Sequence, residues 1–291
     1  MTKLEYNPLN PAQLADPYPL FAEAHRESPV FFSERFNLWV VTRYEDIWTA
    51  LRDPATFSSS VSTTVETSLS PEVEKILEEG WGEVSTLVTS DPPAHTRFRG
   101  LINKAFTPRR VAEREGRIRE LAESLVDGFE ADGHVDLVWQ FAYPLPMTVI
   151  AEILGVPKRD MDRFKGWSDD LVARLSAELP PDRQIECARS LVDFQHYFSA
   201  RLDERASDPR DDMLTDLLNA RIQGEEPLTR GEQLSMLQQL LVAGNETTTN
   251  LIANMVVLLL DRRPSWEAIC ARPELATSAV EEALRMESPV Q

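Results

Sequence analysis

The residues best suited to chemistry gather in the hexapeptide Ala243-Gly244-Asn245-Glu246-Thr247-Thr248, inside an otherwise apolar run from Leu234 to Leu260. A helix interior normally avoids glycine, which costs about 1 kcal/mol relative to alanine, and it avoids a carboxylate that is neither paired nor hydrated. A hydroxyl beside a carboxylate can relay protons: Glu246 would pass them from solvent, and Thr247 would hold a water or a bound oxygen species. Gly244 lacks a Cβ, so a flat ligand or cofactor could lie against the helix backbone there.

A purely structural explanation of the same hexapeptide stays open. In that explanation Thr247 donates a hydrogen bond to the carbonyl of Ala243, Glu246 reaches solvent through a bend, and no catalysis takes place.

Two further pairs carry charge at helical spacing. His95 and Arg99 lie four residues apart, so they share a helix face and could clamp the carboxylate of a bound anion. Glu282 and Arg285 lie three apart near the end of the chain, as acid–base pairs on helices often do. Judged alone, each pair is better explained as an exposed surface contact.

The run that holds the hexapeptide predicts one long helix. At 1.5 Å per residue its 27 residues would span about 40 Å, and its leucines spread round the whole circumference, which favours a buried helix. A membrane span is excluded, because polar side chains interrupt the run. These are Gln238, Gln239, Asn245, Glu246, Asn250 and Asn254.

The other elements are also mostly helical. Val30 to Val41 predicts a β-hairpin, and Thr42 is expected to cap a helix that ends at Pro54. Residues 55–90 are rich in Ser and Thr and predict a long loop, with a short helix near Pro71 to Leu77. Asp91 is expected to cap the helix that carries His95, since Pro92 and Pro93 suit a first helical turn.

Apolar spacing predicts further helices along the rest of the chain. One carries Met147, Ile150, Ala151 and Leu154 and ends at Gly155 and Pro157, and a long one runs from Ile185 to Leu202. Asp211 to Leu218 and Ser265 to Met286 also have helical patterns. The fold class is therefore mainly α, with a minor sheet near the N-terminus, and no linker divides residues 1–291 into more than one domain.

Composition limits the possible partners and the compartment. The 291 residues include 48 Asp and Glu against 30 Lys and Arg, a net charge of −18, which disfavours a nucleic-acid partner. No secretory signal is visible and there are only two cysteines, so the chain is expected to be cytoplasmic. Against this acidic background, residues 97–119 hold eight basic residues and two acidic ones, a local charge of +6. The basic residues are Arg97, Arg99, Lys104, Arg109, Arg110, Arg114, Arg117 and Arg119. They form either a solvated helix face or a docking surface for an acidic partner.

Taken in order, the His-x-x-x-Arg, Ala-Gly-x-Glu-Thr-Thr and Glu-x-x-Arg motifs resemble those of the cytochrome P-450 family, in a soluble bacterial form. The similarity runs from Asn10 to Gln291 and includes the segments 91–99, 105–108 and 280–285. The resemblance implies the fold of that family, a helical prism with a long central helix and a small N-terminal β-sheet. It also implies a haem-thiolate monooxygenase that inserts one oxygen atom into a small apolar molecule, with electrons from NAD(P)H relayed by a redox partner.

The resemblance also assigns roles to residues. His95 and Arg99 would hydrogen-bond the haem propionates, while Ala243 and Gly244 would let the long helix approach the porphyrin. Glu246 and Thr247 would deliver protons for the reduction of dioxygen. Glu282 and Arg285 would form a buried structural pair under the haem.

The substrate and the redox partner are assigned in the same way. Gln239, Val242 and Ala243 would line the substrate pocket, together with the loop 57–90 and the region from Phe164 to Leu191. A ferredoxin or flavin reductase would dock near Arg97, Arg99, Lys104, Arg109 and Arg110.

One family feature is missing, the Phe-x-x-Gly-x-x-x-Cys-x-Gly loop whose thiolate binds the haem iron. Cys187 and Cys270 both lack its glycines, and each is interpreted as a packed helix thiol. The chain is therefore expected to be a fragment that ends before the ligand loop and the final helix. Such a fragment would be inactive, would lose thiolate ligation and would expose apolar surface. The alternative is a catalytically silent helical protein that binds a hydrophobic small molecule without haem.

Overall fold

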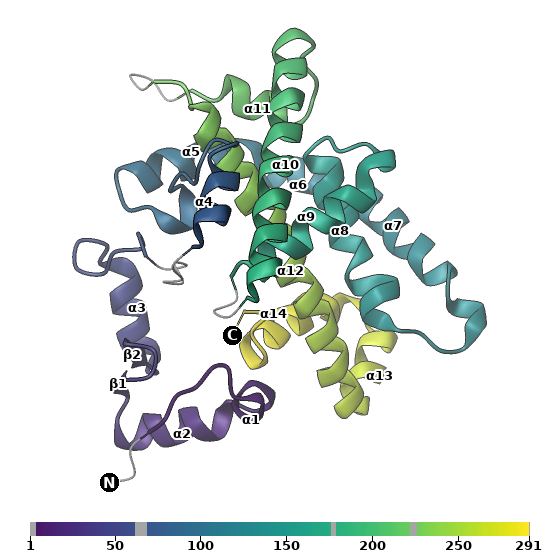
Figure 1. The fold of residues 1–291 in the computed structure, drawn as a ribbon. Helices are drawn as coiled ribbons and strands as arrows, with labels where there is room; N and C mark the ends of the chain where they lie inside the picture. The colour runs from purple at the N-terminus through teal and green to yellow at the C-terminus, as the bar shows by residue number, and fades with distance from the viewer. Residues whose placement is uncertain (1–3, 62–68, 176–178, 222–225, 291) are drawn as a thin grey trace. The chain divides into compact units, whose positions relative to one another are not determined.

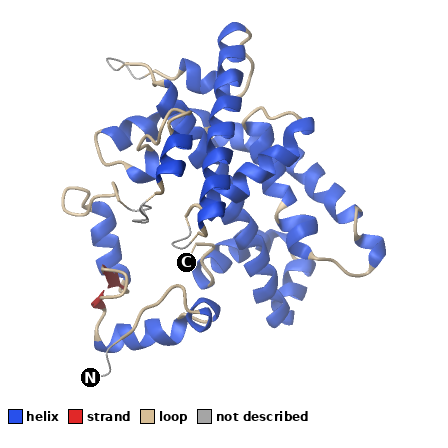
Figure 2. Ribbon diagram, in the orientation of Figure 1, coloured by secondary structure: helices blue, strands red, loops and turns tan. Residues whose placement is uncertain are grey.

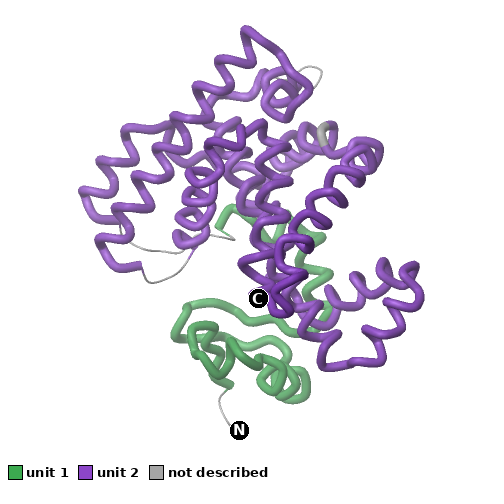
Figure 3. Tube along the Cα trace, turned by 90° about the vertical axis from the view of Figure 1, so that its right-hand side faces the viewer, with its two compact units in different colours: residues 1–62 green, residues 63–291 purple. Residues whose placement is uncertain are grey.

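The computed structural model describes residues 4–61, 69–175, 179–221 and 226–290, apart from the side chain of Ala105. Helices make up most of the described chain, as expected (Figure 2). The chain divides into two compact units, residues 1–62 and 63–291 (Figure 3). None of the described helices is long and apolar enough to span a membrane.

The first unit contains the predicted hairpin. Strands β1 (Val30–Ser33) and β2 (Leu38–Val41) pair antiparallel, with Val30 opposite Val41. Asn37 at the turn has φ +50°, a conformation that asparagine tolerates better than most residues. Helices α1 (Pro11–Ala15) and α2 (Tyr18–Glu27) precede the hairpin.

Helix α3 (Tyr44–Arg52) follows the hairpin and ends before Pro54, as predicted. Its N-cap is Arg43, so the expected cap at Thr42 is wrong. The hydroxyl of Thr42 instead donates to the carbonyl of Pro29 at 3.1 Å, beside the hairpin.

The second unit is helical, and most of its helices lie where the sequence predicts them. Helix α4 occupies the predicted Pro71–Leu77, and α5 (Ala94–Ala105) has Pro93 at its N-cap position instead of the expected Asp91. Helices α8 (Pro144–Ile153) and α10 (Pro181–Ser207) match the predicted apolar stripes. The remaining helices are α6 (Pro108–Glu113), α7 (Glu115–Asp127), α9 (Met161–Ala173), α11 (Met213–Asn219), α12 (Arg230–Asp261), α13 (Arg263–Ala271) and α14 (Ala276–Met286). The short turns are η1 (Leu87–Thr89), η2 (Glu130–Asp132), η3 (Val138–Ala142), η4 (Lys158–Asp160) and η5 (Pro273–Leu275).

Helix α12 is the long helix that the apolar run predicts. It begins with a capping box, in which Thr229 and Glu232 each accept the other's backbone N–H. It runs through Gly244 as one continuous helix (Figure 1). Its first half is buried among α8, α9 and α10, whereas Val257 and Leu260 are more than half exposed. The prediction of a helix buried all round is therefore wrong for the second half, and in the first half Ala243 is also exposed.

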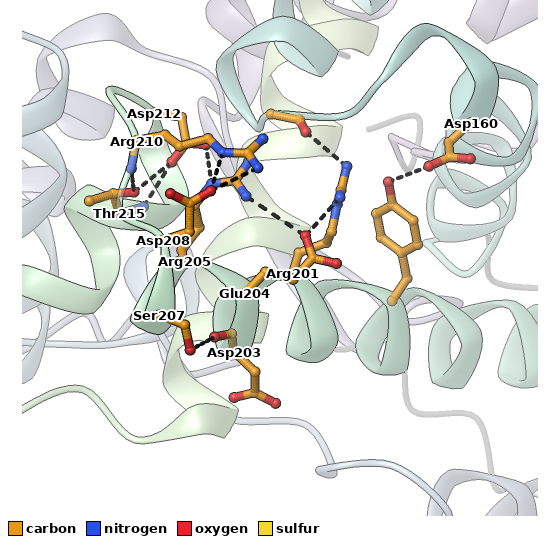
Figure 4. Close-up of polar contacts among 12 residues, drawn as sticks. Asp160, Arg201, Asp203, Glu204, Arg205, Ser207, Asp208, Arg210, Asp212 and Thr215 are labelled. Carbon is orange, nitrogen blue, oxygen red and sulfur yellow. Dashed lines mark hydrogen bonds and ion pairs between the residues drawn. The ribbon is translucent and has the colours of Figure 1, made fainter.

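A buried ion pair joins the end of α10 to the start of α11 (Figure 4). Arg205, 2% exposed, donates from Nε to Oδ2 of Asp212 at 2.6 Å. The other oxygen of Asp212 caps α11 by accepting from the backbone N–H and the hydroxyl of Thr215. Gly155, at φ +68°, lies against this pair, and a Cβ there would be 3.0 Å from Oδ2 of Asp212.

Candidate functional site

One row of α12, at positions 231, 235, 239, 243 and 247, organises the candidate site. Residues four apart on a helix are neighbours, and such a row winds slowly about the axis. The chain segment that precedes α5 covers the start of the row. A Cβ at Gly231 would be 2.9 Å from Cγ2 of Val84, and Ser235 donates to the carbonyl of Val84 at 2.6 Å.

Gln239 is the last position of the row that this segment covers. Its amide contacts Thr86 and Val88. Ala243, the next position, is exposed. The α12 row is therefore covered as far as Gln239 and open at Ala243.

The structure corrects the reason proposed for Gly244. A Cβ at this position would lie 3.0 Å from Cδ1 and 3.1 Å from Cγ1 of Ile150 in α8. The missing Cβ of Gly244 therefore allows α12 to pack closely against α8. Ile150 occupies the space beside Gly244 in which the sequence predicted a flat ligand.

The hydroxyl of Thr247 donates to the carbonyl of Ala243 at 2.7 Å, which is the contact of the structural explanation. This contact uses the hydroxyl hydrogen and leaves the lone pairs of Oγ1 able to accept from a water. Glu246 accepts from Asn250 at 3.4 Å, and Asn250 also donates to the carbonyl of Pro289. Burial and the charges of Asp169 and Glu246 raise the pKa of Tyr143, so its phenol stays protonated near the Glu246 carboxylate.

The fully buried polar residue of the hexapeptide is Asn245, which is 1% exposed. Its amide donates to Oγ of Ser168 at 3.3 Å, and Thr249, one turn later, donates to the carbonyl of Ala142. This role was not predicted from the sequence. The spacing of Asn245 and Thr249 along one face of the helix was the available signal.

His95 and Arg99 share one face of α5, as predicted. His95 is half-buried and Arg99 is exposed. Within the described part of the chain, neither side chain makes a hydrogen bond or an ion pair. Phe98, between them in sequence, is 4% exposed in the core, so α5 is anchored while these two donors remain available for an anion.

Most of the basic residues in 97–119 are paired within the chain. Arg97 donates to Glu232 at 2.9 Å, and both side chains are less than one-fifth exposed. Arg109 pairs with Glu113, Arg110 with Asp216, Arg117 with Glu152 and Arg119 with Glu115, while Lys104 donates to the carbonyl of Arg221. Glu113 and Glu115 are already counted in the local charge of +6, so the partners from outside the segment, Glu152, Asp216 and Glu232, compensate three of these six charges.

Glu282 and Arg285 do pair, through two hydrogen bonds of 2.7 and 2.8 Å. Their side chains are 55% and 69% exposed, so the predicted burial of this pair is wrong. Arg285 holds the pKa of Glu282 below its usual range. The helical spacing predicted the contact, but burial depends on neighbours that spacing does not reveal.

The two thiols differ in environment. Cys187 is buried in α10, and burial raises its pKa, which disfavours the thiolate that an iron ligand requires. Cys270 lies in α13 and is exposed, so its expected packing is wrong. No group of three or more His, Cys, Asp or Glu side chains in the described ranges could hold a metal ion.

A cavity of about 430 Å³ lies away from the α12 row, between α7 and Phe141 of η3. Its apolar lining comes from Ile118, Ala122, Val126 and Phe141, and charged residues of α7 form its rim.

Comparison with known proteins adds to this geometry. No protein-family model matches the chain. The polyketide biosynthesis cytochrome P-450 PksS of Bacillus subtilis is 32% identical over the whole chain, which covers 71% of that protein. The cytochrome P-450 monooxygenase PikC of Streptomyces venezuelae is 36% identical, over 95% of the chain and 64% of that protein. The chain thus spans about two thirds of the length of these curated relatives.

Solved structures agree with the sequence relatives. Cytochrome P-450 CREJ in complex with (4-ethylphenyl) dihydrogen phosphate superposes with a TM-score of 0.88 at 36% identity, over 97% of this chain and 70% of that one. An intact type IV self-sufficient cytochrome P-450 monooxygenase gives a TM-score of 0.90 at 33% identity, over 99% of this chain and 38% of that one.

Proposed function

The chain belongs to the bacterial cytochrome P-450 family, and from this premise we propose that it forms the propionate-binding and distal part of a haem-thiolate monooxygenase. The observation that carries the proposal is the donor pair His95 and Arg99 on α5, within the same unit as the open end of the α12 row. When bound, haem supplies the iron at which dioxygen is reduced and one oxygen atom is transferred to substrate.

The residues present fit one side of this cofactor. His95 and Arg99 offer two donors to the propionates, with Arg99 able to bind a carboxylate through two parallel hydrogen bonds. Ala243 is small and exposed where α12 would meet the ring. Gly244 contributes indirectly, because its contact with Ile150 sets how closely α12 packs against α8. Cys187 is a poor candidate for the thiolate ligand, because burial raises the pKa of its thiol.

Glu246 and Thr247 form the proposed proton path. Oγ1 of Thr247 holds a water through its lone pairs while its O–H donates to the carbonyl of Ala243. Glu246, beside it and partly exposed, takes up protons from solvent and passes them to that water.

The proposed substrate is a small apolar molecule that lies over Ala243, with Val242 and the segment that ends at Val88 as neighbouring walls. We place the protein in the cytoplasm. Electrons would come from NAD(P)H through a ferredoxin or flavin reductase that docks near Arg97, Arg99, Lys104, Arg109 and Arg110. Arg109, whose side chain is 88% exposed, keeps a guanidinium accessible to such an acidic partner.

A haemin titration of the 291-residue chain tests the proposal. Replacing His95 and Arg99 by alanine should each weaken haemin binding about tenfold, because each removes a hydrogen bond to a charged group. His134→Ala and Arg263→Ala serve as matched controls on other parts of the surface. Equal affinity in all four variants contradicts the proposal.

The second candidate is a haem-free binder of hydrophobic small molecules. The cavity between α7 and Phe141, which is lined in part by apolar side chains, favours it. It predicts no specific uptake of haemin, so the same titration separates the two candidates.

A further inference from the structure

Two glutamine side chains, from two different helices, hold the segment 80–88 in place. Gln195 of α10 is 4% exposed; its Oε1 accepts from the N–H of Trp81 at 2.9 Å, and its Nε2 donates to the carbonyl of Gly82 at 3.1 Å. Gly80 is required beside this amide, because a Cβ there would lie 2.1 Å from Oε1 of Gln195. The start of the segment is therefore fixed on α10.

Gln239 of α12 holds the other end in the same way. Its Oε1 accepts from the N–H of Val88 at 3.2 Å. Its Nε2 donates to the hydroxyl and the carbonyl of Thr86, at 2.7 and 3.1 Å. Both polar atoms of the Gln239 amide bind the segment 80–88. Gln239 is therefore poorly placed for the substrate contact predicted from the resemblance.

The backbone between these contacts is in an uncommon conformation. Leu87 has φ +39°, which costs free energy for a residue other than glycine and persists only where surrounding contacts impose it. Leu87 packs against the hydrophobic core, while the side chain of Val88 is 57% exposed. The two side chains therefore point to different environments, and Val88 is attached to α12 at Gln239, one turn before Ala243.

We infer that Gln239 is a positioning residue that fixes Val88 at the open end of the α12 row, where Val88 determines the size of the apolar group that fits over Ala243. The inference rests on the proposed function for the role of Val88, but not for the contact between Gln239 and the segment. Glutamine suits this task because one amide both donates and accepts, whereas glutamate cannot donate and leucine can do neither.

Amide hydrogen exchange in the chain without haem tests the positioning role. Gln239→Leu should speed exchange of the Val88 N–H about tenfold, the effect expected from losing one hydrogen bond. Gln239→Glu should have a smaller effect, because its carboxylate still accepts from that N–H. Gln238→Leu, at the adjacent position of the same helix, should leave the rate within about twofold. An unchanged rate in Gln239→Leu overturns the inference.

Ligand binding to the haemin-loaded chain tests the selection by size. The probes are imidazole and 4-phenylimidazole, and the quantity is the ratio of their Kd values. Val88→Ala should favour the larger probe and Val88→Phe the smaller one, each by about fivefold, a change typical of small differences in an apolar pocket. Both effects should shrink in the Gln239→Leu background, because Val88 is no longer fixed.

The outcomes separate the two proposals. Ratios that do not respond to either substitution of Val88 overturn its role. If the chain takes up no haemin, the role of Val88 fails together with the proposed function, while the exchange rates still decide whether Gln239 holds the segment.

Discussion

Thr247 donates a 2.7 Å hydrogen bond from Oγ1 to the carbonyl oxygen of Ala243, one turn earlier in α12. This bond fixes the hydroxyl at the end of the α12 row that the segment 80–88 leaves open. The same contact is compatible with a structural role alone, so activity must decide between the two.

Removing the proposed proton path should slow chemistry and leave cofactor binding intact. With peroxide as oxidant, the residual oxidation that the haemin-loaded chain carries out without thiolate ligation should fall about 100-fold in Thr247→Ala and in Glu246→Gln, the lower end of the range for general acid–base groups. Thr247→Ser should recover most of the rate, and Thr248→Ala is the neighbouring control. Rates in the Thr247 and Glu246 variants equal to that of the control would favour the structural explanation.

The close contact between Gly244 and Ile150 predicts a packing defect. Gly244→Ala should lower the free energy of unfolding by about 1–3 kcal/mol, because the new Cβ would lie 3.0 Å from Cδ1 of Ile150. Denaturant titration measures this loss, and Ile150→Val in the same chain should restore part of it. In an uncrowded helix the same substitution would stabilise by about 1 kcal/mol, so a gain in stability refutes the contact.

The pair Arg205 and Asp212 predicts a loss of stability in acid. Burial raises the pKa of Asp212, but hydrogen bonds from Thr215 and Arg205 outweigh burial and hold that pKa below its usual range. A carboxyl whose pKa is lower in the folded chain stabilises it above the unfolded pKa of about 3.9, and this stability is lost as the pH falls through the folded value. Asp212→Asn should cost about 3 kcal/mol at pH 7 and should reduce the acid dependence of unfolding below pH 4.

Glu282 and Arg285 form an exposed ion pair, in contrast to the buried pair of Arg205 and Asp212. Both side chains are more than half exposed, so water screens their attraction. Glu282→Gln should leave the midpoint of thermal unfolding of this chain unchanged. A large drop in Tm would mean that the pair is buried after all.

The thiols predict a spectroscopic result. The ferrous–CO complex of the haemin-loaded chain should lack the red-shifted Soret band of thiolate ligation, and Cys187→Ser and Cys270→Ser should leave its spectrum unchanged. A thiol reagent should modify exposed Cys270 in the folded chain and reach Cys187 only after unfolding. Observing the red-shifted band would show that one of these cysteines does bind the iron.

Local patterns were sufficient to predict much of the fold. Pro71 to Leu77, the hairpin of β1 and β2, and the apolar stripe of α8 carry their own start, stop and spacing signals, and the structure confirms them. The resemblance to cytochrome P-450 proteins was likewise confirmed by their sequences and structures. The assignment of residues 1–291 to one domain stays a prediction.

Features that depend on contacts between distant residues were not predictable in this way. A glycine signals that space is needed, but only the fold shows that Ile150 fills the space at Gly244. Arg97 counts as a free positive charge in the sequence, yet Glu232, far along the chain, neutralises it. The amide of Gln239 suggested a ligand contact until its partners Thr86 and Val88 were located.

The spacing along α12 also sets a length scale. Residues 239 and 247 are eight apart, so they lie about 12 Å from each other along the helix axis. Under the proposed function, a substrate that contacts both the wall at Val88 and the hydroxyl of Thr247 must reach across about this axial distance. We therefore expect molecular length, in addition to hydrophobicity, to influence which molecules bind beside this helix.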